Sequence, residues 1–257
     1  MWSAQPTPLT EAVASGDVEK VKSLLGRPAA NDIHDFTVQD KFYAMRTAVE
    51  RDYLWIVSLL LSKGVKPCPF DFCTVVKNLS YPILELMLNT GFDINAAYQK
   101  EYPPFWRDAF SDLELVRWLV EHGADPNAPT MFGLTPFTIA VQCASFETIK
   151  LLLELGASVQ HGYPLHSAVW NNREEEIIEL LLNSGASPST IEFEGQPQAY
   201  ADSVTGVGTP LHVAYLAGNH KLVQLLLEHG ADPKIRDTRG RRPAEIYKIK
   251  GHLTASM

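Results

Sequence analysis

The chain has 257 residues, of which 46% are hydrophobic and 20% charged, as is usual for a globular protein in water. Its formal net charge of −8 argues against a nucleic-acid backbone or an anionic membrane as the main partner, since both require a positive surface. No stretch of about 18 apolar residues could span a bilayer, and no apolar run follows a basic N-terminus.

The three cysteines, Cys68, Cys73 and Cys143, form neither an even disulfide framework nor a zinc-binding pattern. We therefore expect a reduced intracellular compartment, cytoplasm or nucleus, and neither a metal nor a cofactor. The basic residues from Lys234 to Lys250 are interpreted as a solvated capping surface.

In chain order, apolar residues at helical spacing predict successive helix pairs, most of which end at a glycine. The second helix of a pair is the more regular one, with an apolar stripe along one side. The predicted pairs are 7–12 with 18–25, 43–50 with 54–64, 72–77 with 82–91, 104–110 with 113–127, 135–140 with 148–157, 163–168 with 177–186, and 208–214 with 222–233. A truncated closing helix is expected within 240–249.

The last pair has the clearest sequence, Thr209-Pro210-Leu211-His212-Val213-Ala214. A threonine hydroxyl can cap a helix, and proline suits the first helical position, where its missing N–H has no intrahelical partner. Such a pair has two apolar sides and cannot bury both alone, so neighbouring copies are required.

The predicted stop glycines recur along the chain with separations of 27, 32, 33, 29 and 45 residues. They are Gly64, Gly91, Gly123, Gly156, Gly185 and Gly230. A period near 33 combined with Thr-Pro-Leu-His-x-Ala is typical of one repeat class. The sequence therefore resembles the ankyrin-repeat family over nearly its whole length, with the hexapeptide complete only in the last pair.

This resemblance implies an all-α fold, a solenoid of about seven helix pairs plus a truncated C-terminal capping helix, forming a single domain over 1–257. First helices would line a concave side, second helices a convex side, and inter-repeat loops would project as fingers. The approximate repeats are 7–38, 39–66, 67–98, 99–130, 131–160, 161–206 and 207–237, with the cap at 238–257.

Two departures from the family pattern indicate where a binding site could lie. One is an insertion at 189–206, at a finger position, which is either a contact loop or a tolerated insertion. The other is a set of aromatic residues at positions on first helices and fingers that the family usually fills with small or polar groups. The candidate site residues are Trp170, Leu216, Tyr215, Phe132, Phe110, Gln142, Tyr200, Arg107 and Asp108.

Other aromatic and histidine residues are interpreted as structural. Trp55 and Trp118, on second helices, are expected in the core, and Trp170 fits a site contact as well as packing. His166 and His212 match the hexapeptide histidine, which hydrogen-bonds between inter-repeat turns in the family. His122 and His229 lie at helix C-terminal ends, where a cation complements the dipole.

No catalytic motif with convincing spacing is present in the sequence. The leading hypothesis is a monomeric, non-catalytic protein-interaction module that binds a protein partner through the groove and fingers, with Trp170 as anchor. An alternative is a cyclase- or isomerase-type enzyme for a small apolar molecule, its pocket formed by Trp170, Tyr215 and Phe105 under the Tyr200 loop. Arg107, Asp108, Asp202 or Tyr200 would then supply acid, base or electrostatic stabilisation. A self-associating scaffold is a third possibility.

Overall fold

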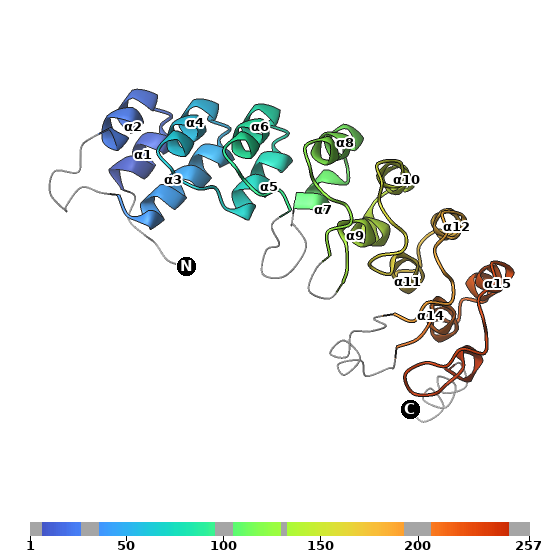
Figure 1. Cartoon of the computed structure of the whole chain (residues 1–257). Helices are drawn as coiled ribbons and strands as arrows, with labels where there is room; N and C mark the ends of the chain where they lie inside the picture. The colour runs from blue at the N-terminus through green and yellow to red at the C-terminus, as the bar shows by residue number, and fades with distance from the viewer. Residues whose placement is uncertain (1–6, 27–35, 96–104, 130–132, 193–206, 247–257) are drawn as a thin grey trace. The chain divides into compact units, whose positions relative to one another are not determined.

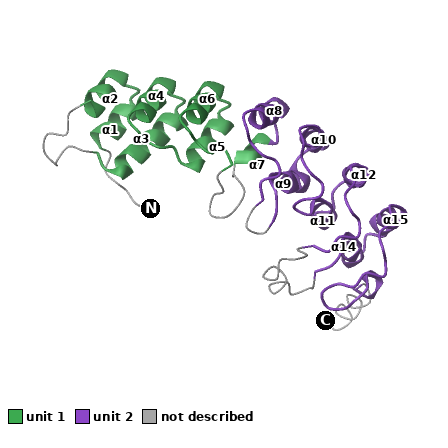
Figure 2. Ribbon diagram, viewed as in Figure 1, with its two compact units in different colours: residues 1–98, 103–109 green, residues 99–102, 110–257 purple. Residues whose placement is uncertain are grey.

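The computed structural model describes residues 7–26, 36–95, 105–129, 133–192 and 207–246. Every regular element among these residues is a helix, which confirms the predicted all-α class (Figure 1). The chain forms two compact units, one of residues 1–98 and 103–109 and one of 99–102 and 110–257 (Figure 2). They are called unit 1 and unit 2, and each is described by itself.

Unit 1 consists of two rows of helices (Figure 1). The first helices α1, α3, α5 and α7 pack one against the next, and so do the second helices α2, α4 and α6. Their bounds are α1 Pro8–Ala14, α2 Val18–Leu25, α3 Val38–Glu50, α4 Leu54–Ser62, α5 Pro69–Lys77, α6 Tyr81–Asn89 and α7 Phe105–Ala109.

Unit 2 repeats this arrangement. The first helices α9, α11 and α14 pack side by side, and the second helices α8, α10 and α12 form a parallel row. The bounds are α8 Leu113–Glu121, α9 Pro136–Cys143, α10 Phe146–Glu154, α11 Pro164–Trp170, α12 Glu175–Asn183, α14 Pro210–Ala217 and α15 His220–Glu228. Residues 243–246 are also helical, within the expected closing helix.

Local sequence determines most helix ends. Thr209 and His212 form a capping box at the start of α14, with Pro210 as the first helical residue. At the other end of the pairs, the six predicted stop glycines all have positive φ, between 76° and 95°. Since a side chain makes that backbone conformation unfavourable, glycine is the residue that ends these helices cleanly.

Two first helices begin earlier than predicted. Helix α3 begins at Val38, after Thr37, and the Thr37 and Asp40 side chains form a capping box. Helix α5 begins after Cys68, whose backbone N–H donates to the Asp71 carboxylate at 2.8 Å. The third pair therefore has the start of the hexapeptide in altered form, with cysteine in place of threonine and aspartate in place of histidine.

The cores of both units lie between the two rows. In unit 1, Phe72 stacks on Phe92 with ring centroids 4.6 Å apart and meets Phe105 edge-on at 5.2 Å. The prediction that Trp55 packs in the core is wrong, because its side chain is 76% exposed. Helix α4 is apolar almost all round, so its sequence does not reveal which face is buried; Ile56, Val57, Leu60 and Leu61 take the core positions.

Candidate functional site

The candidate surface is the solvent-facing side of the first helices α9, α11 and α14 of unit 2. It is called the inner-helix face. Gln142, Trp170 and Leu216 occupy the same place on these three helices, six residues after the helix-initiating proline. The amide Nε2 of Gln142 donates to the Ser167 hydroxyl at 3.4 Å, which joins α9 to α11 along this face. Equivalent side chains therefore form a row across neighbouring first helices.

Trp170 projects furthest from this row, with 62% of its surface exposed. Its backbone is nevertheless well supported. The Asn171 side chain donates to the Ser167 carbonyl at 2.8 Å, and the Asn219 amide donates to the Asn172 side chain at 3.0 Å. A large aromatic ring is thus held on a fixed helix end with most of its area in contact with solvent.

The remaining candidate residues divide into four groups. Tyr215 is half-buried on α14, next to the row residue Leu216, which is also half-buried. Phe110 is only 5% exposed and contributes to the core of unit 2, so it offers no surface to a ligand. Phe132 and Tyr200 lie outside the described residues, as does most of the 189–206 insertion.

Arg107 and Asp108 lie on α7 and belong to unit 1, separately from the inner-helix face. The Asp108 carboxylate lies 3.5 Å from the Lys77 ammonium, so it forms an ion pair within its own unit. Phe105 is 2% exposed and cannot line the aromatic pocket that the enzyme hypothesis required. That part of the enzyme hypothesis is wrong, because the Phe105 ring packs inside the repeat.

A ladder of hydrogen bonds connects each first helix of unit 2 to the turn that follows in the next repeat. The Thr138 hydroxyl donates to the Gly162 carbonyl at 2.8 Å, and His166 Nε2 donates to the Gly208 carbonyl at 3.1 Å. His212 Nε2 donates to the Arg241 carbonyl at 3.0 Å. This geometry matches the structural role predicted for the two histidines.

Both ladder histidines are held neutral. Burial lowers the pKa of His166 to about 4, with a smaller contribution from the nearby His212. Burial also lowers the pKa of His212, whose Nδ1 accepts from the Thr209 backbone N–H at 3.0 Å. Because that nitrogen accepts while Nε2 donates, the geometry fits a neutral imidazole acting as a structural link.

Arg173 has a role that its sequence position did not reveal. Its guanidinium donates to the carbonyls of Val141 and Ala144, at 2.5 and 2.6 Å, and so binds the C-terminal end of α9. Free carbonyls at a helix end require such partners, and a cation suits their negative dipole. The sequence alone does not reveal this role, because it depends on the end of α9 lying next to Arg173 in the folded chain.

The insertion is closed at its base by a backbone hydrogen bond from Glu192 N–H to the Gly208 carbonyl, at 3.1 Å. Burial raises the pKa of the Glu192 carboxyl to about 6. Gly208 is closely packed here, since a Cβ at this position would lie 2.6 Å from Cγ of His212. The described ends of the insertion are therefore anchored on the ladder.

The second-helix side of unit 2 has a shallow open groove of about 530 Å³ between α8 and α10. It is lined by Leu113, Glu114, Arg117, Phe146, Glu147, Lys150, Leu151 and Glu154. Over the described part of the chain, no three His, Cys, Asp or Glu side chains are grouped so that they could hold a metal ion. Among the same residues, none of the helices has the length and apolar character needed to cross a membrane.

Comparison with known proteins gives a consistent result. A family model described as three copies of the ankyrin repeat matches residues 106–192, and the single ankyrin repeat model matches 208–238. The ankyrin repeat protein nuc-2 of Neurospora crassa is 35% identical over 94% of this chain and 23% of its own length. The ankyrin repeat protein FPV240 of fowlpox virus is 29% identical over 50% of this chain and 30% of its own.

The transient receptor potential cation channel subfamily A member 1 of Homo sapiens is 24% identical over 90% of this chain and 25% of its own length. The chain thus spans between about a quarter and a third of these three relatives. The family models and the names of two of these relatives agree on the ankyrin repeat. The chain is an ankyrin-repeat protein.

Proposed function

We propose that this chain is a non-catalytic, monomeric interaction module that binds a partner protein through the inner-helix face of unit 2, with Trp170 as the anchor. Ankyrin repeats are in general protein-interaction modules, which supports the class of function. The observation that carries the assignment to this face is the 62% exposure of a tryptophan whose helix end is tied to its neighbours.

The energetics favour Trp170 as an anchor. Interface residues that dominate affinity are enriched in tryptophan, and they pack into the centre of the contact. Covering such a ring removes a large apolar area from water and costs little conformational entropy if the backbone is already fixed. The half-buried Tyr215 and Leu216 would extend the apolar contact on one side, and Gln142 would supply a polar group on the other.

The proposed site of action is the interior of the cell. All three cysteines are free, with Cys143 exposed and Cys73 buried. Burial raises the pKa of Cys73 to about 12, and the charge of Asp108 adds to this, so the thiol stays protonated and unreactive. Free, unpaired thiols suit a reducing compartment.

The test is affinity capture from native lysate with three forms of the chain: wild type, Trp170→Ala and Trp55→Ala. The last is the matched control, because Trp55 is an exposed tryptophan on a second helix of unit 1. Removing a central aromatic anchor costs about 2 kcal/mol or more, which is about 30-fold in affinity. With the captured chain below saturation, Trp170→Ala alone should therefore recover much less of the partner. Equal recovery by Trp170→Ala and wild type, with unchanged circular dichroism, would remove the anchor role.

A further inference from the structure

The loop that follows α15, residues 234–242, is called the closing finger. Seven of the 22 lysine and arginine residues of the chain fall within 234–250, and five of them are in the finger itself. They are Lys234, Arg236, Arg239, Arg241 and Arg242. This is a local positive region on a chain of formal net charge −8.

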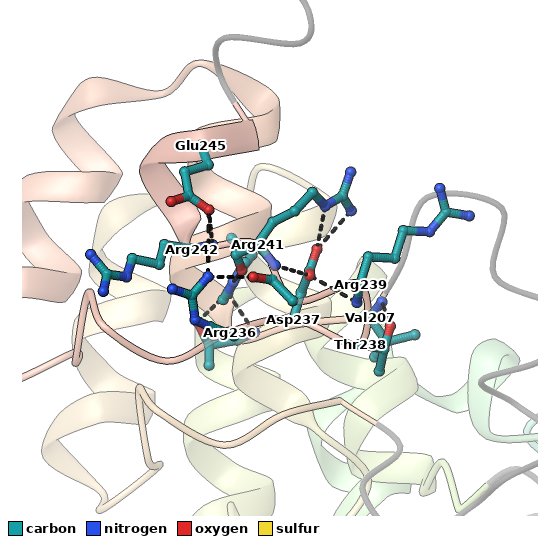
Figure 3. Close-up of polar contacts among 11 residues, drawn as sticks. Val207, Arg236, Asp237, Thr238, Arg239, Arg241, Arg242 and Glu245 are labelled. Carbon is teal, nitrogen blue, oxygen red and sulfur yellow. Dashed lines mark hydrogen bonds and ion pairs between the residues drawn. The ribbon is translucent and has the colours of Figure 1, made fainter.

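The buried Asp237 carboxylate organises the finger (Figure 3). Its Oδ1 accepts the backbone N–H groups of Arg239 and Arg241, at 2.9 and 2.8 Å, and its Oδ2 accepts Nε of Arg241 at 2.8 Å. Burial by itself would raise the pKa of Asp237, but the Arg241 guanidinium and the two N–H donors lower it below its usual value. The carboxylate therefore stays charged and holds the turn.

The finger is also fixed to the body of unit 2. Thr238 N–H donates to the Val207 carbonyl and Val207 N–H donates to the Thr238 hydroxyl, both at 2.9 Å. The carbonyl of Arg241 accepts from His212, on α14. Because α14 also carries Leu216, the finger and the inner-helix face have a common support.

The acidic groups in this part of the chain are already engaged. Asp237 is bound to Arg241, and the Glu245 carboxylate accepts the Arg242 backbone N–H at 2.8 Å and lies 3.9 Å from the Arg236 guanidinium. Lys234 and Arg242 are exposed, so the finger presents positive charge to solvent from a fixed backbone.

We propose that the closing finger binds a run of aspartate and glutamate side chains in the partner protein, beside an apolar residue that contacts Trp170. This inference rests on the proposed function and specifies its partner as an acidic linear segment. Guanidinium groups match carboxylates in shape and charge, and a preformed turn reduces the entropy lost on binding. A nucleic acid or an anionic membrane is less favoured than a short acidic peptide, because the remaining negative charge of the chain repels an extended polyanion.

The experiment selects linear peptides from a random display library on the full chain. Three targets are compared: wild type, the double variant Lys234→Gln/Arg242→Gln, and the control Arg51→Gln/Arg117→Gln. The control removes the same charge from exposed arginines outside the finger. Wild type and control should enrich peptides with acidic residues next to an apolar one, whereas the finger variant should enrich apolar residues without the acidic bias.

A second measurement is fluorescence anisotropy of one selected peptide and of its version with every acidic residue changed to the amide. We expect about tenfold weaker binding for the amide version, and a similar loss when the acidic peptide meets the finger variant. Affinity of the acidic peptide should also fall on raising salt from about 50 to about 300 mM.

The outcomes separate the two proposals. Wild type could select peptides that have no acidic bias and that no longer bind the Trp170→Ala variant. That result would overturn the finger inference and leave the proposed function standing. Failure to enrich any peptide would count against both. The inference would also be overturned if a single-stranded oligonucleotide bound more tightly than the acidic peptide at equal salt, since the finger would then recognise phosphate groups.

Discussion

Several side chains of unit 2 form hydrogen bonds with a neighbouring repeat, and Arg173 forms two of them. It lies just before α12, yet its guanidinium binds the carbonyls of Val141 and Ala144 at the end of α9. With 12% of the side chain exposed, the pair of charged hydrogen bonds is largely shielded from water. Such bonds contribute more to stability than exposed ion pairs.

The first prediction is that Arg173→Ala lowers the free energy of unfolding by about 2–3 kcal/mol, because two buried carbonyls lose a charged donor. Arg173→Lys should recover only part of the loss, since one ammonium cannot reproduce the fork. Urea unfolding followed by circular dichroism measures both. Arg117→Ala, at an exposed arginine of α8, is the control, and a loss as large as that of Arg173→Ala would refute the specific role.

The second prediction concerns His166 and pH. The folded-state pKa of this residue is about 4 against an ordinary histidine value of 6.5, so between these values the unfolded chain binds a proton that the folded chain does not. The free energy of unfolding should therefore fall by about 2 kcal/mol from this group as the pH drops from about 7 to about 5. The neighbouring His212, whose pKa is also lowered, adds to the fall in the same direction.

The variant His166→Gln cannot titrate, so its free energy of unfolding should change less between the two pH values than that of wild type. The comparison uses the pH-dependent difference within each variant, which separates titration from any loss of the hydrogen bond to Gly208. Identical pH dependence in the two proteins would show that His166 is not the group responsible.

At the scale of helices, the repeat is stabilised by second helices whose buried stripes face their own first helix and the next pair. Helix α15 buries Leu222, Val223, Leu225 and Leu226, and it begins with Asn219 capping the Leu222 N–H. The stop glycine Gly230 then has space around it and a φ of 84°, so its role is conformational. These features are local, and the sequence pattern predicted the stop glycine correctly.

The third prediction is that Leu226→Ala costs about 2–5 kcal/mol, the usual range for leucine truncated in a packed core. Leu226 has no exposed area, and α15 packs against α14. Leu227→Ala is the matched control, because Leu227 is 39% exposed one position further along the same helix. A thermal melt in which both variants lose equal stability would contradict the assigned core.

For the whole molecule, stability is built from contacts between adjacent helix pairs within each of two compact units. The charge is distributed unevenly, since the closing finger is basic while the chain as a whole is acidic. An interaction module of this kind gains specificity by combining an apolar anchor with a local charge that differs from its surroundings. Both proposed elements, Trp170 and the finger, lie in unit 2.

The sequence by itself determined the all-α class, the helix pairs and their glycine stops, because capping, proline placement and apolar spacing are local effects. It identified the bonding role of His166 and His212 through the family pattern. It also missed the earlier starts of α3 and α5, although Thr37 with Asp40 and Cys68 with Asp71 carried a capping signal.

Only the tertiary structure decided which large side chains are covered. Phe110 and Phe105 pack inside, Trp55 lies outside, and Trp170 is exposed, although all four are aromatic residues on or beside short apolar helices. Burial depends on which neighbouring helix meets each face, and a helix that is apolar all round does not specify that face. The same holds for Arg173 and Asp237, whose partners lie across a turn or a repeat and become apparent only when the chain has folded.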